Sequence, residues 1–381
     1  MKIMDDIYQK ALQFHKKHRG KIEVKSKVPL ADRETLSLAY TPGVARVSEE
    51  IGRDAALAYE YTLKQNTVAI VSDGSAILGL GNLGAHAAIP VMEGKAAIFK
   101  EFADIDAFPI CLDTQDTEEI IATVKRLAPV FGGINLEDIS APRCFEIERR
   151  LRAELPIPVM HDDQHGTATV VLAALLNALR VSGRKKENVS IVISGAGAAG
   201  TAITRILLGY GFSDIILCDS KGAIFEGRND LDGNKKELAR LTNKDKQMGN
   251  LSKVISGADV FIGVSKPGLV TEEMVKTMNE KPIIFALANP TPEIMPGVAH
   301  RAGAFIVATG RSDFPNQINN SLAFPGIFRG ALDNRIRQFT DSMFVRAAEK
   351  LAEYVTNPTT EALLPAQFDK GIVLAIKETI R

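Results

Sequence analysis

The chain has 381 residues, which is enough for two or three domains that each bury a core of their own. Hydrophobic residues make up 45% and charged residues 24%, as in ordinary globular proteins. Lys+Arg and Asp+Glu both number 46, so no overall field favours nucleic acid or an anionic membrane, and we expect neither as a partner.

Cysteine usage and apolar runs indicate the compartment. Cys111, Cys144 and Cys218 are scattered without C-x-x-C spacing, which is typical of reduced thiols rather than of a disulfide framework. The first residues are too charged for a secretory signal, and the longest apolar run, 168–176, is too short to span a membrane. We therefore expect a cytoplasmic protein.

The N-terminal part begins with apolar side chains at helical spacing over residues 4–18. This spacing predicts an amphipathic helix, whose apolar stripe could also be a subunit contact. A polar stretch follows, in which Tyr40 lies just before Pro42 and Gly43, residues that break regular structure. On local grounds, Tyr40 is typical of a half-buried loop aromatic.

A buried strand is predicted at 67–72, and the pattern G-x-G-x-x-G follows it at Gly79, Gly81 and Gly84. Six residues separate this strand from the glycines, and Pro90 is expected to interrupt the next helix, so the pattern is a weak dinucleotide signal. We expect it to serve close packing or a substrate carboxylate.

Lys95 lies in predominantly apolar surroundings. A partly desolvated lysine can have its pKa lowered enough to act as a base. The alternative is a lysine that snorkels to solvent, which is the commoner arrangement.

Two acidic clusters end predicted strands. Glu137 and Asp138 follow an apolar pair, and they can reach one hard cation if the backbone bends there. The alternative is an N-cap for the helix that begins near Pro142. The second cluster is HDDQH at residues 161–165, directly before a long helix, and it contains Asp163.

Carboxylate oxygens drawn from Glu137, Asp138 and Asp163 would suit Mg²⁺ or Mn²⁺. His161 and His165 make zinc conceivable, but neither an H-x-x-x-H helix nor a cysteine supports it.

The strongest pattern occupies residues 190–219, which read as strand, glycine turn, helix and a second strand ending in an acid. Gly195 permits the tight turn, Gly197 lets the backbone approach a pyrophosphate, and Gly200 lets helix pack on strand. Asp219 is placed to accept hydrogen bonds from an adenosine ribose. This context predicts a dinucleotide-binding Rossmann-type unit.

Apolar strands alternate with polar loops and helices up to about residue 310, the rhythm of a continuing parallel sheet. Asn289 lies at the carboxyl end of one such strand, where open α/β sheets bind ligands. Asn319 and Asn320 lie in a later loop, where making turns is the default role of asparagine. Helices are predicted over 333–355 and 372–380.

Together these segments resemble the malic enzyme family, in the order in which the family carries them, over about residues 35–330. The length resembles the short prokaryotic-type branch. The motifs are LAYTPGV around Tyr40, SDGSAILGLGNLG from Ser72, IPVMEGK ending at Lys95, INLEDI around Glu137 and Asp138, HDDQHGTA around Asp163, GAGAAG, FALANPTPEI around Asn289 and INNSLAFPG around Asn320.

The resemblance implies an α/β fold with three parts. A Rossmann-type doubly wound parallel-sheet domain at 162–318 follows an N-terminal α/β catalytic domain at 1–161, and a C-terminal helical segment at 319–381 packs back on the latter. It also implies a homodimer, in which one subunit can contribute to its neighbour's site.

The implied reaction is oxidative decarboxylation of L-malate to pyruvate and CO₂ with reduction of NAD or NADP. Glu137, Asp138 and Asp163 match the family's divalent-metal ligands, for Mg²⁺ or Mn²⁺. Lys95 matches the general base, with Asp162 in support, and Tyr40 matches the acid that protonates the enol, if a cation such as Lys95 lowers its pKa.

The binding residues follow from the same motifs. Asn289, Asn319 and Asn320 match contacts to the substrate carboxylates. The residues that match cofactor contacts are Gly195, Ala196, Gly197, Ala198, Ala199, Gly200, Asp219 and Asn289.

Two points stay open. Ala76 stands where many family members have an arginine that holds a malate carboxylate, so another cation or the asparagines must replace it. Asp219 gives a slight preference for NAD because a carboxylate repels a 2′-phosphate, although Lys221 or Arg228 could meet a phosphate. The alternative functions are another metal-assisted 2-hydroxy-acid dehydrogenase and a catalytically silent nucleotide-binding sensor.

Overall fold

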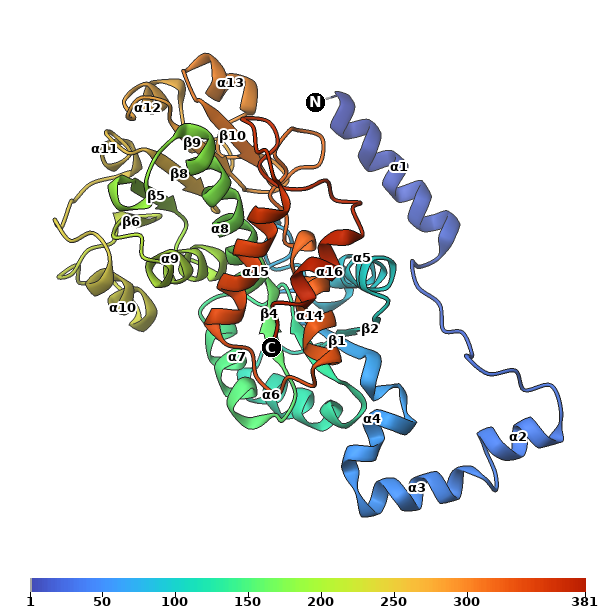
Figure 1. The fold of residues 1–381 in the computed structure, drawn as a ribbon. Helices are drawn as coiled ribbons and strands as arrows, with labels where there is room; N and C mark the ends of the chain where they lie inside the picture. The colour runs from blue at the N-terminus through green and yellow to red at the C-terminus, as the bar shows by residue number, and fades with distance from the viewer. Residues whose placement is uncertain (1) are drawn as a thin grey trace.

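The structure, a computed structural model, describes residues 2–381 and contains two largely parallel sheets joined by one long helix (Figure 1). The first sheet has the order β2-β1-β3-β4, and all its pairings are parallel. Its strands are β1 (Thr67–Ser72), β2 (Asp106–Cys111), β3 (Gly133–Leu136) and β4 (Val159–His161). The helices α5 (Ala85–Ala103), α6 (Thr117–Leu127) and α7 (Arg143–Glu154) and the short η3 (Ala128–Val130) accompany them.

The register of β3 against β4 decides where the acids lie. Leu136 pairs with His161, the last residue of each strand. Because neighbouring parallel strands end at the same edge of a sheet, the two acidic clusters that follow these residues meet there.

The second sheet has the order β10-β9-β8-β5-β6-β7, parallel except for the short edge strand β7. Chain order reverses on either side of β5, which makes the end of β5 the switch point of a Rossmann-type sheet and confirms the predicted fold class. Its strands are β5 (Ser190–Ser194), β6 (Asp214–Asp219), β7 (Gly222–Ala223), β8 (Val260–Gly263), β9 (Ile283–Ala286) and β10 (Ile306–Thr309). The helices of this part are η4 (Lys186–Asn188), α9 (Ala198–Tyr210), α10 (Gly233–Leu241), α11 (Leu251–Val254), α12 (Glu272–Lys276) and α13 (Pro296–Arg301).

Helix α8 (Asp162–Ser182) connects the two sheets, and most of its length is buried. It packs against α9 on one side and against α15 (Asp341–Tyr354) on another. The other C-terminal helices, η5 (Asn320–Leu322), α14 (Phe324–Asp333) and α16 (Gly371–Lys377), return to the first sheet. There the ring of Phe99 lies 4.7 Å from that of Phe324, so the predicted packing of C-terminal helices on the N-terminal part is confirmed (Figure 1).

The N-terminal segment comprises α1 (Lys2–His18), α2 (Arg33–Ala39), α3 (Val44–Arg53), η1 (Ala55–Leu57), α4 (Ala58–Tyr61) and η2 (Leu63–Asn66). It leads from α1, which borders the body, out to α2 and α3, which project away from it (Figure 1), and back through α4 and η2. None of the side chains of α2 and α3 is buried. We call residues 19–53 the arm.

Two helices differ from the sequence expectations, and the helices were also compared with the length needed to cross a membrane. Pro90 lies inside the continuous helix α5 rather than interrupting it. The helix predicted over 333–355 is two helices, because α14 ends at Asp333 and α15 begins at Asp341. Among residues 2–381, no helix is both long and apolar enough to cross a bilayer.

Candidate active site

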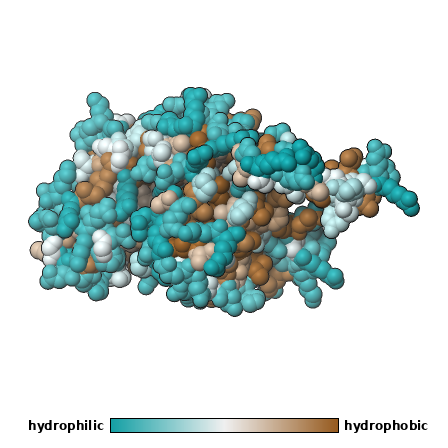
Figure 2. All heavy atoms as spheres, turned by 90° about the horizontal axis from the view of Figure 1, so that it is seen from below, coloured by the Kyte–Doolittle hydropathy of each residue, from teal (hydrophilic) through white to brown (hydrophobic). Residues whose placement is uncertain are grey.

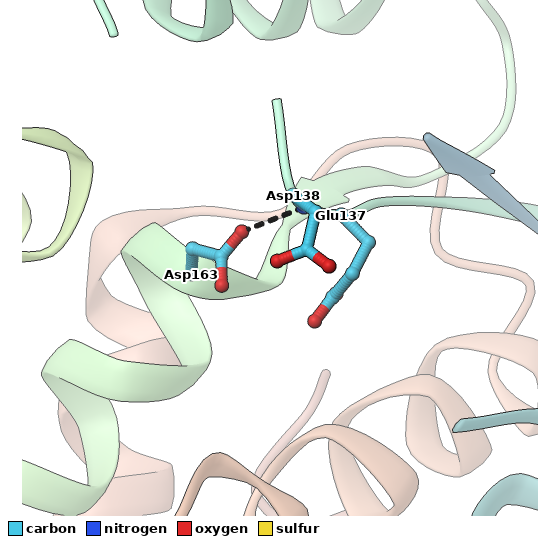
Figure 3. A group of neighbouring side chains, drawn as sticks. All are labelled: Glu137, Asp138 and Asp163. Atoms are coloured by element: carbon cyan, nitrogen blue, oxygen red, sulfur yellow. Dashed lines mark hydrogen bonds between the residues drawn. The ribbon is translucent and has the colours of Figure 1, made fainter. Parts of the chain in front are cut away.

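Three carboxylates meet at the shared edge of β3 and β4. Glu137 and Asp138 follow β3, Asp163 lies in the first turn of α8, and one oxygen of each lies within 4.8 Å of the others (Figure 3). Asp138 has φ of 52°, the left-handed bend that lets two adjacent acids face one point. Neither Glu137 nor Asp138 caps α7, whose N-cap is Pro142.

The electrostatics of this cluster favour the binding of a cation. Burial, helped by repulsion between the acids, raises the pKa of Glu137 to about 7, of Asp138 to about 9 and of Asp163 to about 6. Oδ2 of Asp138 is buried without a hydrogen-bond partner. Three hard oxygen donors with an orphaned atom fit a cation such as Mg²⁺ or Mn²⁺.

His161 does not change this preference. Burial lowers its pKa to about 4, so the ring is neutral, and its Nε2 lies 3.5 Å from Oδ2 of Asp163. The metal-ligating cluster among the described residues contains carboxylates alone, which favours Mg²⁺ or Mn²⁺ over zinc.

Lys95 of α5 also reaches the carboxylate cluster. Its Nζ lies 2.7 Å from Oε1 of Glu137, contacts Oδ2 of Asp162 and lies over the ring of Phe324. Burial alone would lower the pKa of Lys95, but the carboxylates of Asp162 and Glu137 outweigh it and raise the pKa. The expected lowering of the pKa is therefore wrong for the metal-free protein, and so is the snorkelling alternative, since the side chain is 7% exposed.

Asp162 is the partner that can share this proton. It is fully buried, and burial raises its pKa to about 7 despite the nearby lysine. Gly166, one turn later on α8, has no room for a side chain, because a Cβ would overlap Oδ1 of Asp162.

Two supporting residues were missed in the sequence. Asn135 donates from Nδ2 to Oε2 of Glu137 at 3.0 Å, and a polar residue inside an apolar strand was the available signal. Glu148 of α7 accepts hydrogen bonds from the backbone N–H of His161 and the side chain of Gln164, both at 3.0 Å. Glu148 lies in the middle of a helix among other charged residues, so nothing in the sequence distinguishes it as a site residue.

A cleft of about 630 Å³ collects most of the predicted site. Residues from the regions of both sheets line this cleft. Residues of the loop that leads into η5 complete its wall. The predicted residues on its walls are Lys95, Glu137, Asp138, Asp163, Ala199, Asn289, Asn319 and Asn320.

A larger hollow of about 1350 Å³ lies elsewhere, between α7, α9 and α15. Several charged side chains on its walls are engaged: Arg205 pairs with Glu237, and Arg152 donates to the carbonyl oxygen of Phe339. The smaller cleft holds the carboxylate cluster, and we take it as the candidate active site.

Tyr40 is not brought to this cleft within the chain. It is the C-cap of α2 in the arm, and 67% of it is exposed. Its expected proximity to Lys95 is therefore absent in the single chain, and its half-buried alternative does not hold either.

The glycine turn after β5 has a specific geometry at each position. Gly195 has φ of 114°, and a Cβ there would lie 2.6 Å from the carbonyl oxygen of Val264. A Cβ on Gly200 would overlap the carbonyl oxygen of Gly195, whereas Gly197 faces open space. Helix α9 begins after Gly197 without a side-chain cap, so its first N–H groups are available to an anion.

Asp219 at the end of β6 is already held by cations. Nη2 of Arg228 donates to both carboxylate oxygens, at 2.8 and 2.9 Å, and Nζ of Lys235 lies 3.2 Å from Oδ2. The backbone N–H of Lys221 donates to Oδ1 at 3.0 Å. The acid is thus neutralised where an adenosine ribose would lie.

In the other glycine pattern close packing holds for Gly79, whereas Gly81 and Gly84 face open space. A side chain on Gly79 would overlap the backbone of Asn289, and one on Gly74 would overlap Gly84. No helix N-terminus directly follows β1, since a loop separates them up to Gly84.

Comparison with known proteins gives a consistent result. The malic enzyme N-terminal domain matches residues 19–152, and the malic enzyme NAD-binding domain matches residues 164–370. The chain is 55% identical to a bifunctional malic/malolactic enzyme of Bacillus subtilis, over 98% of this chain and 92% of that one. It is 47% identical to an NADP-dependent malic enzyme of Escherichia coli, over 97% of this chain but 49% of that longer protein.

Solved structures agree in fold. A crystal structure of an NAD-dependent malic enzyme from Thermotoga maritima is 51% identical, with a TM-score of 0.94, and the match covers 97% of this chain and 98% of that one. A malic enzyme from Pyrococcus horikoshii is 48% identical, with a TM-score of 0.92, over 98% and 89% of the two chains. This chain belongs to the malic enzyme family.

Proposed function

We propose that the cleft is the active site in which this malic enzyme oxidises L-malate to pyruvate and CO₂ and reduces NAD or NADP. The observation that carries the proposal is the cluster of three carboxylates beside Lys95, in a cleft that also reaches Ala199 in the first turn of α9. A divalent cation held by Glu137, Asp138 and Asp163 would polarise the C2–O bond of malate and stabilise the enolate charge.

Lys95 and Asp162 handle the proton of the malate hydroxyl. The carboxylates beside Lys95 raise its pKa, so Lys95 must first pass on its own proton, and Asp162, which contacts Nζ and has a pKa of about 7, is the group that can take it. The neutral amine then accepts the hydroxyl proton. Loss of that proton accompanies transfer of hydride from C2 to the nicotinamide.

The dinucleotide lies along the turn from Gly195 to Gly200, including Ala196, Ala198 and Ala199. The open space at Gly197 and the uncapped start of α9 support a pyrophosphate there. Asn289 extends from the same sheet into the cleft and contacts both cofactor and substrate. Asn319 and Asn320 add amide donors for a substrate carboxylate; Oδ1 of Asn319 accepts from the backbone of Ser321, which leaves its NH₂ group as the donor.

Tyr40 acts in a homodimer, in the cleft of the partner chain. The arm supports this arrangement, because it extends from the body and exposes apolar side chains such as Leu36, Leu38 and Val44. In Figure 2 a projection at the right carries hydrophobic residues, and hydrophobic residues also gather on the adjoining face. An arm that crosses to a second copy would bury them.

We keep the three parts expected from the sequence as the proposed domains. Residues 1–161 hold the metal site, residues 162–318 hold the dinucleotide site, and residues 319–381 form the helices that pack on the first part. A cytoplasmic location likewise remains a proposal.

The function is tested by incubating the purified chain with L-malate, Mn²⁺ and either NAD or NADP. We expect reduced nicotinamide and pyruvate in equal amounts, and no product when the metal is chelated. Lactate in place of pyruvate would assign a malolactic reaction. A product with an unchanged carbon count would assign another 2-hydroxy-acid dehydrogenase. If no 2-hydroxy acid is turned over, the catalytically silent nucleotide-binding sensor would be the function that the test supports.

A further inference from the structure

Lys21, directly after α1, lies on the wall of the same cleft. Its Nζ donates to the carbonyl oxygen of Pro90 at 2.5 Å and lies beside Gly94, where a Cβ would be 3.5 Å away. Pro90 and Gly94 are four residues apart and so share a face of α5, and Lys95 comes next. The absence of a side chain at Gly94 leaves room for the ammonium group.

The charges in the cleft leave Lys21 as the available cation. Among the residues that the structure describes, His15, Lys21 and Lys95 are the basic groups on its walls. Lys95 is engaged by Glu137 and Asp162. Among residues 6–381, whose side chains the structure describes, Lys21 has no ion-pair partner, and burial, only partly offset by Glu93, lowers its pKa.

His15 is less suited to hold an anion. Its Nδ1 lies 2.8 Å from the carbonyl oxygen of Ala11, which can only accept, so Nδ1 carries the proton. Its other nitrogen, Nε2, is buried without a hydrogen-bond partner and so presents almost no surface to a substrate carboxylate.

A dianionic substrate needs such a cation. Four carboxylates, those of Glu137, Asp138, Asp162 and Asp163, face one engaged lysine and the two charges of a metal ion. Malate adds two more negative charges. Ala76, which also lines the cleft, offers no charge to balance them.

We propose that Lys21 binds the carboxylate of malate that does not chelate the metal, an assignment that rests on the proposed function. Nζ of Lys21 lies beside Gly94, the residue before Lys95, and both lysines line the cleft that holds the carboxylate cluster. The two side chains therefore offer separate positive groups to the two ends of a bound diacid. Its hydroxyl end lies at Lys95 and the carboxylate cluster, and its far carboxylate lies at Lys21.

The test separates a substrate contact from a structural one. Lys21→Ala should raise KM for malate by about tenfold or more, with kcat changed by less than about twofold, since the contact exists before the chemical step. Lys21→Arg should restore much of the affinity. Oxalate chelates the metal but has no far carboxylate, so its inhibition constant should stay the same in Lys21→Ala.

The matched control is Lys25→Ala, which removes an exposed lysine four residues later in the arm and should leave every constant unchanged. A malate KM in Lys21→Ala equal to that of the parent overturns the proposal. So does a parallel rise in the malate KM and the oxalate inhibition constant, which would assign Lys21 to holding α1 against α5. A parent chain without malate turnover would instead sink the proposed function.

Discussion

The backbone N–H of Asp138 donates a hydrogen bond to Oδ2 of Asp163, 2.9 Å away (Figure 3). This bond ties the loop after β3 to the first turn of α8 and leaves the other oxygens of both acids for a cation. Asp163 thus has two roles that substitution can separate.

Asp163→Asn keeps a carbonyl oxygen for the bond from Asp138 but removes the charge. We expect it to fold like the parent and to lose most metal-dependent turnover, by about a hundredfold or more. Asp163→Ala should lose the bond as well, and should unfold at a lower temperature than Asp163→Asn. Calorimetry and Mn²⁺ titration would measure both effects, and equal melting temperatures for the two variants would contradict the structural role of the bond.

The pKa values of the cluster predict how pH acts on the metal-free protein. In the unfolded chain Glu137, Asp138 and Asp163 titrate near about pH 4, whereas in the fold their pKa values rise to about 7, 9 and 6. Between these values the folded state binds more protons, so the free energy of unfolding falls as pH rises from about 4 to 9. A bound cation removes this penalty by pairing the ionised acids.

We therefore expect the rise in Tm caused by Mn²⁺ or Mg²⁺ to grow with pH over this window. Differential scanning calorimetry with and without metal would measure it. Asp138→Asn, which removes the most strongly shifted acid, should flatten the pH dependence without metal. A metal effect independent of pH would show that the acids are ionised before the cation binds.

Cofactor preference can be tested at Asp219. Because Arg228 and Lys235 neutralise this acid, we expect NADP to be used at rates comparable to NAD, rather than being excluded as a free carboxylate would require. Lys235→Ala should raise KM for NADP by about tenfold while changing KM for NAD by less than about twofold. Lys236→Ala, on the same helix, is the control. Equal effects of Lys235→Ala on both dinucleotides would contradict the idea that Lys235 offsets the charge of Asp219 beside a 2′-phosphate.

The proposed sharing of a cleft between subunits predicts complementation between two inactive chains. Tyr40→Phe removes the proposed proton donor, and Lys95→Ala removes the proposed base, so each homodimer should be nearly inactive. If the arm carries Tyr40 into the partner's cleft, mixed dimers contain one cleft with both residues intact. Co-expressed variants should then regain up to about a quarter of the parent activity, the share of intact clefts in a random mixture of chains. No recovery in mixtures shown to contain mixed dimers would place Tyr40 within its own chain.

Much of the metal site could be predicted from the sequence because it depends on short-range patterns. Parallel strands that end in acids must bring those acids to one edge, and Leu136 opposite His161 does this. The glycine turn after β5 could be predicted for a similar reason, since its strand, turn and helix follow one another directly along the chain.

Other properties depended on contacts that spacing does not encode. The pKa of Lys95 rises because Asp162 and Glu137, distant in sequence, both reach its Nζ. The pairing of Asp219 with Arg228 follows from the fold of the loop between them. Pro90 was read as a helix breaker, but burial of α5 against the core stabilises the helix despite the missing N–H.

Helix α8 separates the proposed cation site from the proposed dinucleotide site, and we expect the two ligands to exchange at different rates. All three acids of the metal cluster belong to the first sheet and to the start of α8, whereas Gly195 and Asn289 belong to the second sheet. A movement of the second sheet that releases the reduced nucleotide leaves the cluster intact. The cation can therefore remain in place over many turnovers while the dinucleotide exchanges in each one.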